Sequence, residues 1–139
     1  MFRNILLPID LTERSERAVK AAGDLAEAHA ASVRLLHVVQ TIADVPYDEM
    51  KDFYAELMAK AEDAVARWAE NLSARGIEVE GQVVLGKRVP EILRHAEEGE
   101  SDLIVMSFDQ LDPAQPGGGL GSVGHQVALI AGCPVLLMR

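Results

Sequence analysis

Apolar residues along the chain follow two alternating patterns. Five short apolar runs have the length of buried strands, and they lie at residues 4–9, 32–39, 77–83, 102–106 and 134–138. Between them, apolar residues recur at helical spacing in four segments, at residues 18–29, 50–72, 90–96 and 122–131. Strands that alternate with helices from end to end predict an α/β domain with a parallel sheet and right-handed crossovers. We expect a single domain over residues 1–139.

Polar residues and glycines refine the ends of these segments. The third strand alternates its apolar residues with acids and a glutamine, which is typical of a strand at a sheet edge. Thr12 and Ser122 are suited to cap the first and last helices. Gly76 is expected at the C′ position of the long helix.

The longest helical pattern also carries half of the six aromatic residues. Its apolar stripe consists of Met50, Phe53, Tyr54, Leu57, Met58, Ala61, Ala64, Val65, Trp68 and Leu72. Apolar residues at this spacing line the buried face of an amphipathic helix. We therefore interpret the stripe as core or interface and not as a cofactor site.

Composition narrows the classes of partner. The 139 residues include 13 basic and 22 acidic ones, which gives a net charge of −9. Nucleic acids and anionic membranes require a basic face, so neither is expected as a partner. The longest apolar stretch, residues 127–138, is too short for a membrane span, which needs about 20 residues. The N-terminal residues lack the layout of a signal peptide, and we expect a cytoplasmic protein.

A ligand of such a sheet binds beyond the carboxyl ends of the strands, where the strand order reverses. Asp10 follows the first strand, and its carboxylate is suited either to a ribose hydroxyl or metal, or to capping the following turn. The loop after the fourth strand contains Gly117 to Gly119 and leads into Gly121 and Ser122. Glycines before a helix suit an anion, but this loop has no Lys or Arg. On these residues alone, a surface loop with Ser122 as a cap is favoured.

Catalytic and metal-binding patterns are not evident in the sequence. The four histidines, His29, His37, His95 and His125, are not spaced as metal ligands. His37 is expected in the core or at its rim. The single cysteine, Cys133, is expected to be a buried small residue, and no nucleophile elbow is present. We therefore expect neither an enzyme nor a metal site.

Several stretches together resemble the universal stress protein family. They are residues 4–10, 36–39, 102–106, 121–123 and 133–139, in the order and spacing of that family. The resemblance implies five parallel strands in the order 3-2-1-4-5 with helices on both faces, a Rossmann-like fold. It also implies homodimers joined through the last strand. The apolar residues Val135 to Met138 fit that role, because an exposed sheet edge is normally covered or paired.

Family members that bind ATP carry the pattern G-x2-G-x9-G-[ST] after the fourth strand. Here Ser107 and Gln110 occupy the first two glycine positions, and only Gly121 and Ser122 match. Asp10 and Val38 match the positions that meet the ribose and the adenine in those members. Side chains at the two altered positions would crowd a phosphate held by backbone amides.

The resemblance and the altered pattern favour a non-catalytic regulatory protein of the stress response. Such a protein would act as a homodimer through contacts with an unidentified protein partner and would need no cofactor. The alternative is an ATP-binding nucleotide sensor or slow ATPase that uses the crevice between strands 1 and 4. The two hypotheses differ in the loop from Ser107 to Ser122.

Overall fold

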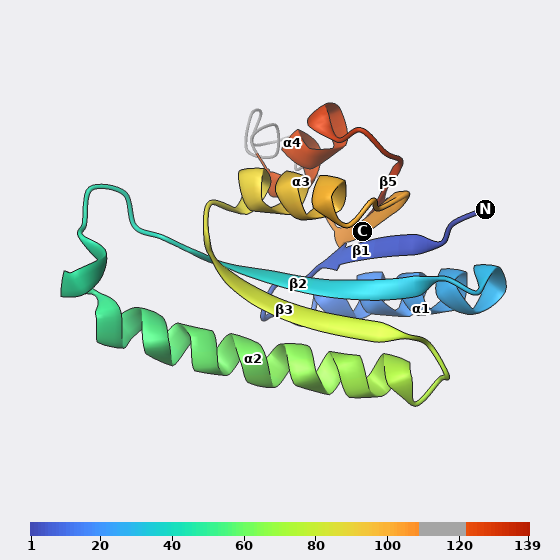
Figure 1. The fold of residues 1–139 in the computed structure, drawn as a ribbon, viewed down its shortest axis with the longest axis horizontal. Helices are drawn as coiled ribbons and strands as arrows, with labels where there is room; N and C mark the ends of the chain where they lie inside the picture. Colours follow the sequence, from blue (N-terminus) through green and yellow to red (C-terminus); the bar gives the residue numbers. More distant parts are fainter. Residues whose placement is uncertain (109–121) are drawn as a thin grey trace.

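The computed structural model describes residues 1–108 and 122–139, and it contains one parallel sheet with helices on both faces (Figure 1). The strands are β1 (Asn4–Pro8), β2 (Ser32–Gln40), β3 (Val79–Gly86), β4 (Leu103–Ser107) and β5 (Val135–Met138). The helices are α1 (Ser15–His29), α2 (Lys51–Ser73), α3 (Arg88–Glu98) and α4 (Val123–Ile130), with a short 3-10 helix η1 (Tyr47–Glu49) before α2. The strand order β3-β2-β1-β4-β5 confirms the predicted fold.

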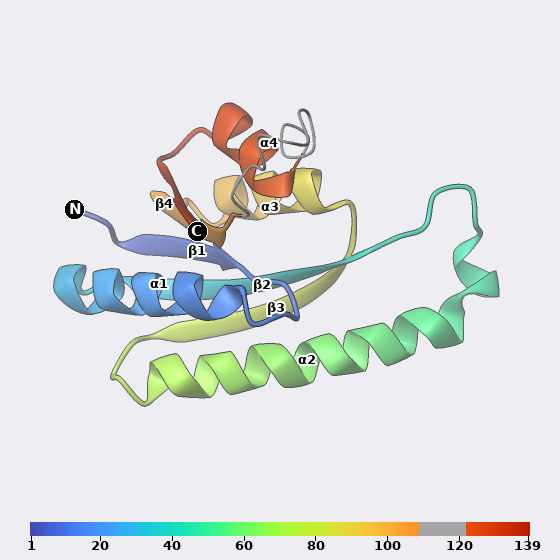
Figure 2. The same cartoon turned by 180° about the vertical axis from the view of Figure 1, so that it is seen from behind.

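Alternate residues of the strands pack into two separate cores. Ile5 and Leu7 of β1 are buried with α1 and α2, whereas Leu6 between them is buried with α3 and α4. The two views of the ribbon show these helix pairs on opposite faces of the sheet (Figures 1 and 2). A strand covered on both faces is apolar at every position, which explains the continuous hydrophobic runs of β1 and β4.

The strand β3 forms one edge of the sheet, as its alternating pattern predicts. It pairs only with β2 among the described strands, and Glu80 and Gln82 are exposed. Gly81 permits α2 to pack closely on this strand, because a Cβ at that position would lie 2.5 Å from Val65 Cγ1.

The opposite edge of the sheet, β5, is short and apolar. Leu136 is 37% exposed, and Leu129 and Ile130 at the end of α4 are 74% and 62% exposed. Among the described strands, β5 pairs with β4 alone. This edge therefore combines unpaired backbone groups with exposed apolar side chains.

Two details of the helix ends differ from the prediction. Thr12 is not the N-cap of α1: the helix begins at Ser15 after Arg14, whose side chain makes no capping hydrogen bond, and Thr12 Oγ1 accepts the Arg14 N–H at 3.3 Å. Thr12 is held instead by the Asp10 carboxylate, which accepts both its backbone N–H and its hydroxyl. Gly76 has a φ of +80°, in the left-handed region that favours glycine, but it lies one residue beyond the expected C′ position because the C-cap is Ala74.

The long helix also departs from its predicted buried stripe at one position. Phe53 is 45% exposed, although the spacing placed it with the inward residues. Within the described residues, no helix is sufficiently long and apolar to cross a bilayer.

Candidate functional site

A cavity of about 400 Å³ lies at the carboxyl ends of β1, β2 and β4. After β1 the chain continues into a helix on one face of the sheet, and after β4 into a helix on the other face. The strand order therefore reverses between β1 and β4, where the cavity lies. Its volume is within the range of about 300–1,000 Å³ typical of small-molecule sites. Four of the six predicted site residues line it: Asp10, Val38, Ser107 and Ser122. The other two, Gln110 and Gly121, lie outside the described residues.

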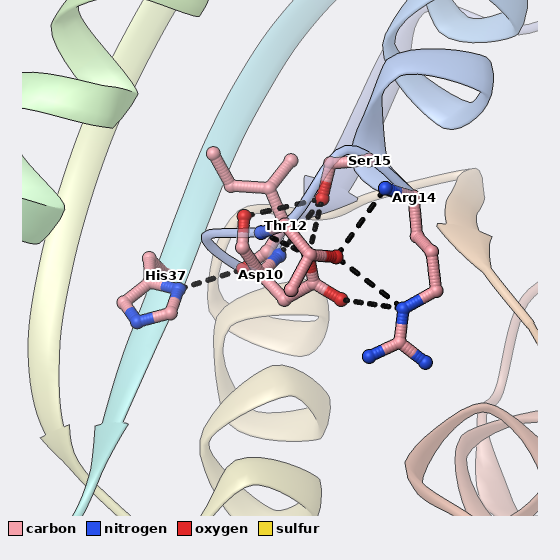
Figure 3. A network of polar contacts seen from close by, with 6 residues as sticks. Asp10, Thr12, Arg14, Ser15 and His37 are labelled. Atoms are coloured by element: carbon pink, nitrogen blue, oxygen red, sulfur yellow. Dashed lines mark hydrogen bonds and ion pairs between the residues drawn. The ribbon is translucent and has the colours of Figure 1, made fainter.

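The first wall of the cavity is a turn held together by Asp10. The Asp10 Oδ1 atom accepts the Thr12 N–H at 2.8 Å, the Thr12 hydroxyl at 2.6 Å and the Ser15 hydroxyl at 3.1 Å (Figure 3). Ser15 is 1% exposed, and its Oγ also accepts the backbone N–H of Asp10. The turn therefore fixes the carboxylate at the cavity wall.

The second carboxylate oxygen of Asp10 has a different environment. Among the described residues, Asp10 Oδ2 accepts no hydrogen bond, and Arg14 Nε lies 4.0 Å from it. The two readings of Asp10 from the sequence are thus compatible, because one oxygen caps the turn and the other remains for a ligand hydroxyl. Whether Asp10 binds a ribose remains a prediction.

The ionisation of Asp10 follows from these contacts. Partial burial acts to raise the pKa of this carboxyl, but the hydrogen bonds from Thr12 and Ser15 and the Arg14 guanidinium together lower the pKa below its usual value. The carboxylate is therefore ionised at neutral pH. It is a hydrogen-bond acceptor and not a proton donor.

The backbone of Val38 contributes to the second wall. Pairing between β1 and β2 ends at Pro8 and Leu36, and the Leu36 carbonyl accepts the Ile9 N–H at 2.9 Å. In a parallel ladder, alternate residues direct their backbone groups to the same neighbouring strand. Val38 therefore directs its N–H and C=O toward the side of β1, beyond the point where β1 ends. These are suitable groups for the edge of a planar base.

His37 belongs to the same wall. The residue is 8% exposed, and its Nδ1–H donates to the Ile9 carbonyl at 2.7 Å (Figure 3). The prediction of a core or rim histidine is therefore confirmed. The contact links β2 to the chain that leaves β1.

The third wall is the N-terminus of α4. Ser122 Oγ accepts the His125 N–H at 3.2 Å, which confirms the predicted cap. Gly124 allows α4 to approach β4, because a Cβ there would lie 3.1 Å from the Phe108 ring. The start of α4 lines the cavity, and the positive end of a helix dipole favours an anion.

Two charged residues of the cavity lining, Arg14 and Arg88, were not predicted from the sequence. The loop from Ser107 to Ser122, where an anion site was considered, contains no Lys or Arg. Arg14 follows β1 and Arg88 follows β3, so both come just after the carboxyl end of a parallel strand. This position after a strand end is the sequence signal that could have identified them. The two arginines add positive charge to the cavity of an acidic protein.

The remaining candidates lie away from the cavity lining. His29, His95, His125 and Cys133 are not among its residues. Cys133 is partly buried against the core beneath α3 and α4, and burial, together with Asp102, raises the pKa of its thiol. Over residues 1–108 and 122–139, no three His, Cys, Asp or Glu side chains are grouped as metal ligands.

Comparisons with known proteins place the chain in a family. The profile of the universal stress protein family matches residues 1–139. A universal stress protein of Thermus aquaticus is 34% identical over 140 residues, and YxiE of Bacillus subtilis is 29% identical over 149 residues. Both alignments cover the whole of each chain. The solved structure of UspA from Lactobacillus plantarum has a TM-score of 0.82 at 24% identity, and the match covers 99% of this chain and 98% of that one.

These matches extend from the first strand to the last, and they agree with the observed strand order. The predicted family resemblance is therefore confirmed, and the chain belongs to the universal stress protein family.

Proposed function

We propose that this protein is a non-catalytic regulator of the stress response that binds an adenine nucleotide in the cavity and acts as a homodimer. The cavity carries the proposal, because its three walls offer separate groups for the three parts of a nucleotide. The backbone of Val38 suits a base, Asp10 Oδ2 suits a ribose hydroxyl, and the start of α4 suits a phosphate.

The phosphate side has support beyond the helix terminus. Arg14 and Arg88 line the same cavity, and guanidinium groups are effective partners of phosphate oxygens. Ser107 occupies a glycine position of the ATP-binding pattern, so its side chain reduces the space beside β4. The proposal therefore favours a nucleotide with one phosphate over a triphosphate.

Two structures of the same fold contain ligands of this class. One is a universal stress protein in complex with cAMP, and another, from Archaeoglobus fulgidus, is in complex with dAMP. Their sequence identities to this chain are 24% and 18%, so the likeness concerns the fold. The proposal for this chain rests on its own cavity.

Thermal denaturation with added ligand tests the proposal. AMP, cAMP and ATP are each added to protein stripped of nucleotide, and inorganic phosphate is the control. A ligand at one hundred times its dissociation constant stabilises the native state by about 2.7 kcal/mol, so a clear rise in Tm is expected with AMP or cAMP. No rise with any nucleotide would contradict the proposal, and so would the same rise with phosphate alone.

The homodimer part of the proposal concerns the β5 edge. Leu136, Leu129 and Ile130 expose apolar surface beside a strand with one unpaired side. A second copy of this edge would pair the backbone and cover the apolar residues. Leu136→Asp is expected to convert the protein to a monomer in sedimentation equilibrium. Leu11→Asp, in the loop after β1, is the control, and a dimer that survives Leu136→Asp would exclude this edge.

The non-catalytic part is tested by turnover. The cavity histidine, His37, is held by the Ile9 carbonyl through Nδ1 and supports the wall. We therefore expect no release of phosphate from ATP above that of a buffer control. Hydrolysis that is lost in Asp10→Ala would favour the alternative, a slow ATPase. Placement in the cytoplasm remains a prediction from the sequence.

A further inference from the structure

A second candidate site lies away from the cavity, in a segment that we term the aromatic arm, residues 41–58. It contains the loop after β2, the short helix η1 and the first part of α2. The ribbon shows this segment projecting past the sheet (Figures 1 and 2). The helix α2 has 23 residues and is about 35 Å long, whereas the eight residues of β3 beneath it span about 26 Å. The helix is therefore longer than the strand that it covers, and its N-terminal end extends past the end of β3.

The aromatic arm has a small core of its own. Tyr54 is 2% exposed and is buried with Val39 and Ala61, separately from the two main cores. Its hydroxyl accepts the backbone N–H of Ile42 at 2.7 Å, which ties the loop to the helix. The surface of the arm therefore rests on a packed and hydrogen-bonded base.

Aromatic side chains cover the outside of this base. Tyr47 and Phe53 are 51% and 45% exposed, and Ile42, whose backbone N–H bonds to Tyr54, is 44% exposed. Tyr47 is stacked on Tyr54, with ring centroids 5.9 Å apart and an interplanar angle of 3°. Aromatic residues are enriched at protein interfaces, and their faces attract arginine and lysine. The arm thus offers rings that are already held in position.

The charge around these rings has one dominant sign. Residues 42–56 contain the acids Asp44, Asp48, Glu49, Asp52 and Glu56, and a single basic residue, Lys51. None of the five acids forms an ion pair with any residue in the described ranges 1–108 and 122–139. An acidic surface repels nucleic acid, anionic lipid and a second copy of this acidic chain.

We propose that the aromatic arm is a docking surface for a basic segment of another protein, one that carries arginine or lysine between apolar residues. The rings of Tyr47 and Phe53 receive the cationic and apolar side chains. The surrounding carboxylates supply long-range attraction and orientation. This proposal does not depend on nucleotide binding in the cavity.

Fluorescence anisotropy with defined peptides tests the proposal. The probe is a labelled peptide that alternates arginine with leucine, and the negative control alternates glutamate with leucine. Wild-type protein is expected to bind the arginine peptide, with an affinity that falls as salt increases. Tyr47→Ala/Phe53→Ala is expected to weaken binding about tenfold or more, as loss of aromatic anchors does at other interfaces. Leu11→Ala, which removes an apolar side chain that is also 45% exposed, should change it little.

A matched pair of charge variants separates the arm from the general acidity of the chain. Asp48→Asn/Glu49→Gln/Asp52→Asn removes three carboxylates of the arm. Glu16→Gln/Glu62→Gln/Asp63→Asn removes three exposed carboxylates elsewhere. We expect the first set to weaken binding about tenfold and the second less than about twofold. Equal losses would overturn the proposal, because they would indicate nonspecific attraction.

Other occupants of the surface would give different results. Dissociation of a dimer in Tyr47→Ala/Phe53→Ala would assign the arm to a second copy and overturn the proposal. Binding to vesicles of anionic phospholipid, or equal binding of the glutamate peptide, would also overturn it. No binding of the arginine peptide by wild-type protein would do the same. Far-UV circular dichroism of each variant establishes that the fold is retained.

Discussion

The cavity and the aromatic arm both adjoin the end of β2, but they differ in the charge of their side chains. Val38 of β2 lines the cavity, and the next residue, Val39, is buried in the core of the arm. Successive side chains of a strand point to opposite faces, so neighbouring positions serve two regions. The cavity lining includes two arginines and one acid, Asp10, whereas the arm carries five acids and one lysine. The proposed anion site and the proposed docking surface for a basic segment thus begin at the same strand end.

The two regions also differ in the contacts that stabilise them. The cavity walls are the ends of buried strands, and the Asp10 turn is closed by several short hydrogen bonds. The arm extends beyond the sheet and rests on a small cluster around Tyr54. We therefore expect the arm to be more sensitive than the cavity to the loss of one side chain.

Removal of the arm's buried ring should have the largest effect on stability. Tyr54→Ala is expected to lower the free energy of unfolding by about 3–5 kcal/mol, because it leaves a cavity in the arm's core. Tyr47→Ala, on the exposed side of the same stack, should cost less than about 1 kcal/mol. Urea unfolding measures both. Similar costs for the two variants would mean that the arm has no core of its own.

Loss of the Asp10 carboxylate should weaken ligand binding in the cavity without affecting the aromatic arm. Asp10→Ala is expected to weaken AMP binding about tenfold or more, since a charge-assisted hydrogen bond contributes about 1.5–3 kcal/mol. It should leave binding of the arginine peptide unchanged. Asp10→Asn controls for the turn, because its amide oxygen can still accept from Thr12. Weakened peptide binding in Asp10→Ala would show that the two regions are not independent.

Removal of the Arg88 guanidinium should have a smaller effect of the same kind. Arg88 is exposed and lines the cavity at the start of α3. Arg88→Ala is expected to weaken AMP binding about fivefold and adenosine binding little, because the lost attraction acts on the phosphate. Isothermal titration with both ligands measures the difference. An equal loss for adenosine would place Arg88 away from the phosphate.

The smallest expected effect is on the pH dependence of stability. The fold lowers the pKa of Asp10, so its stabilising contribution is complete above the unfolded-state pKa and is lost as the pH falls through the lower folded-state value. Asp10→Asn should therefore lose less stability than wild-type protein below about pH 4. Urea midpoints across that range test this. Parallel curves would mean that the folded state does not favour the Asp10 carboxylate.

The fold could be predicted because its signals are local and agree with one another. The apolar runs of β1 and β4 mark strands buried on both faces, and the alternation in β3 marks an edge. Ser122 was predicted correctly as a cap, because serine is a favoured N-cap residue and it directly precedes the helical pattern. Thr12 was misassigned because the Asp10 carboxylate, two residues earlier, competes for its polar groups.

The cavity could be predicted only in part, because it joins residues that are distant in the sequence. Asp10 and Ser122 were predicted from their positions beside a strand end and a helix start, and Val38 and Ser107 through the family pattern, whereas Arg14 and Arg88 meet only in the fold. The exposure of Phe53 depends on where the sheet ends beneath α2. Helical spacing in the sequence does not show where that end lies. The dimer, the ligand, and the roles of Gln110 and Gly121 remain predictions.

Calorimetric titration of nucleotide-stripped protein with AMP, and then with ATP and magnesium, tests the central claim most directly. Native mass spectrometry of the unstripped protein shows whether it retains a bound nucleotide after purification. The account predicts a dissociation constant for AMP in the micromolar range, weaker binding of ATP, and a large loss of both in Asp10→Ala. The absence of heat with either nucleotide, together with no nucleotide in the purified protein, would contradict it.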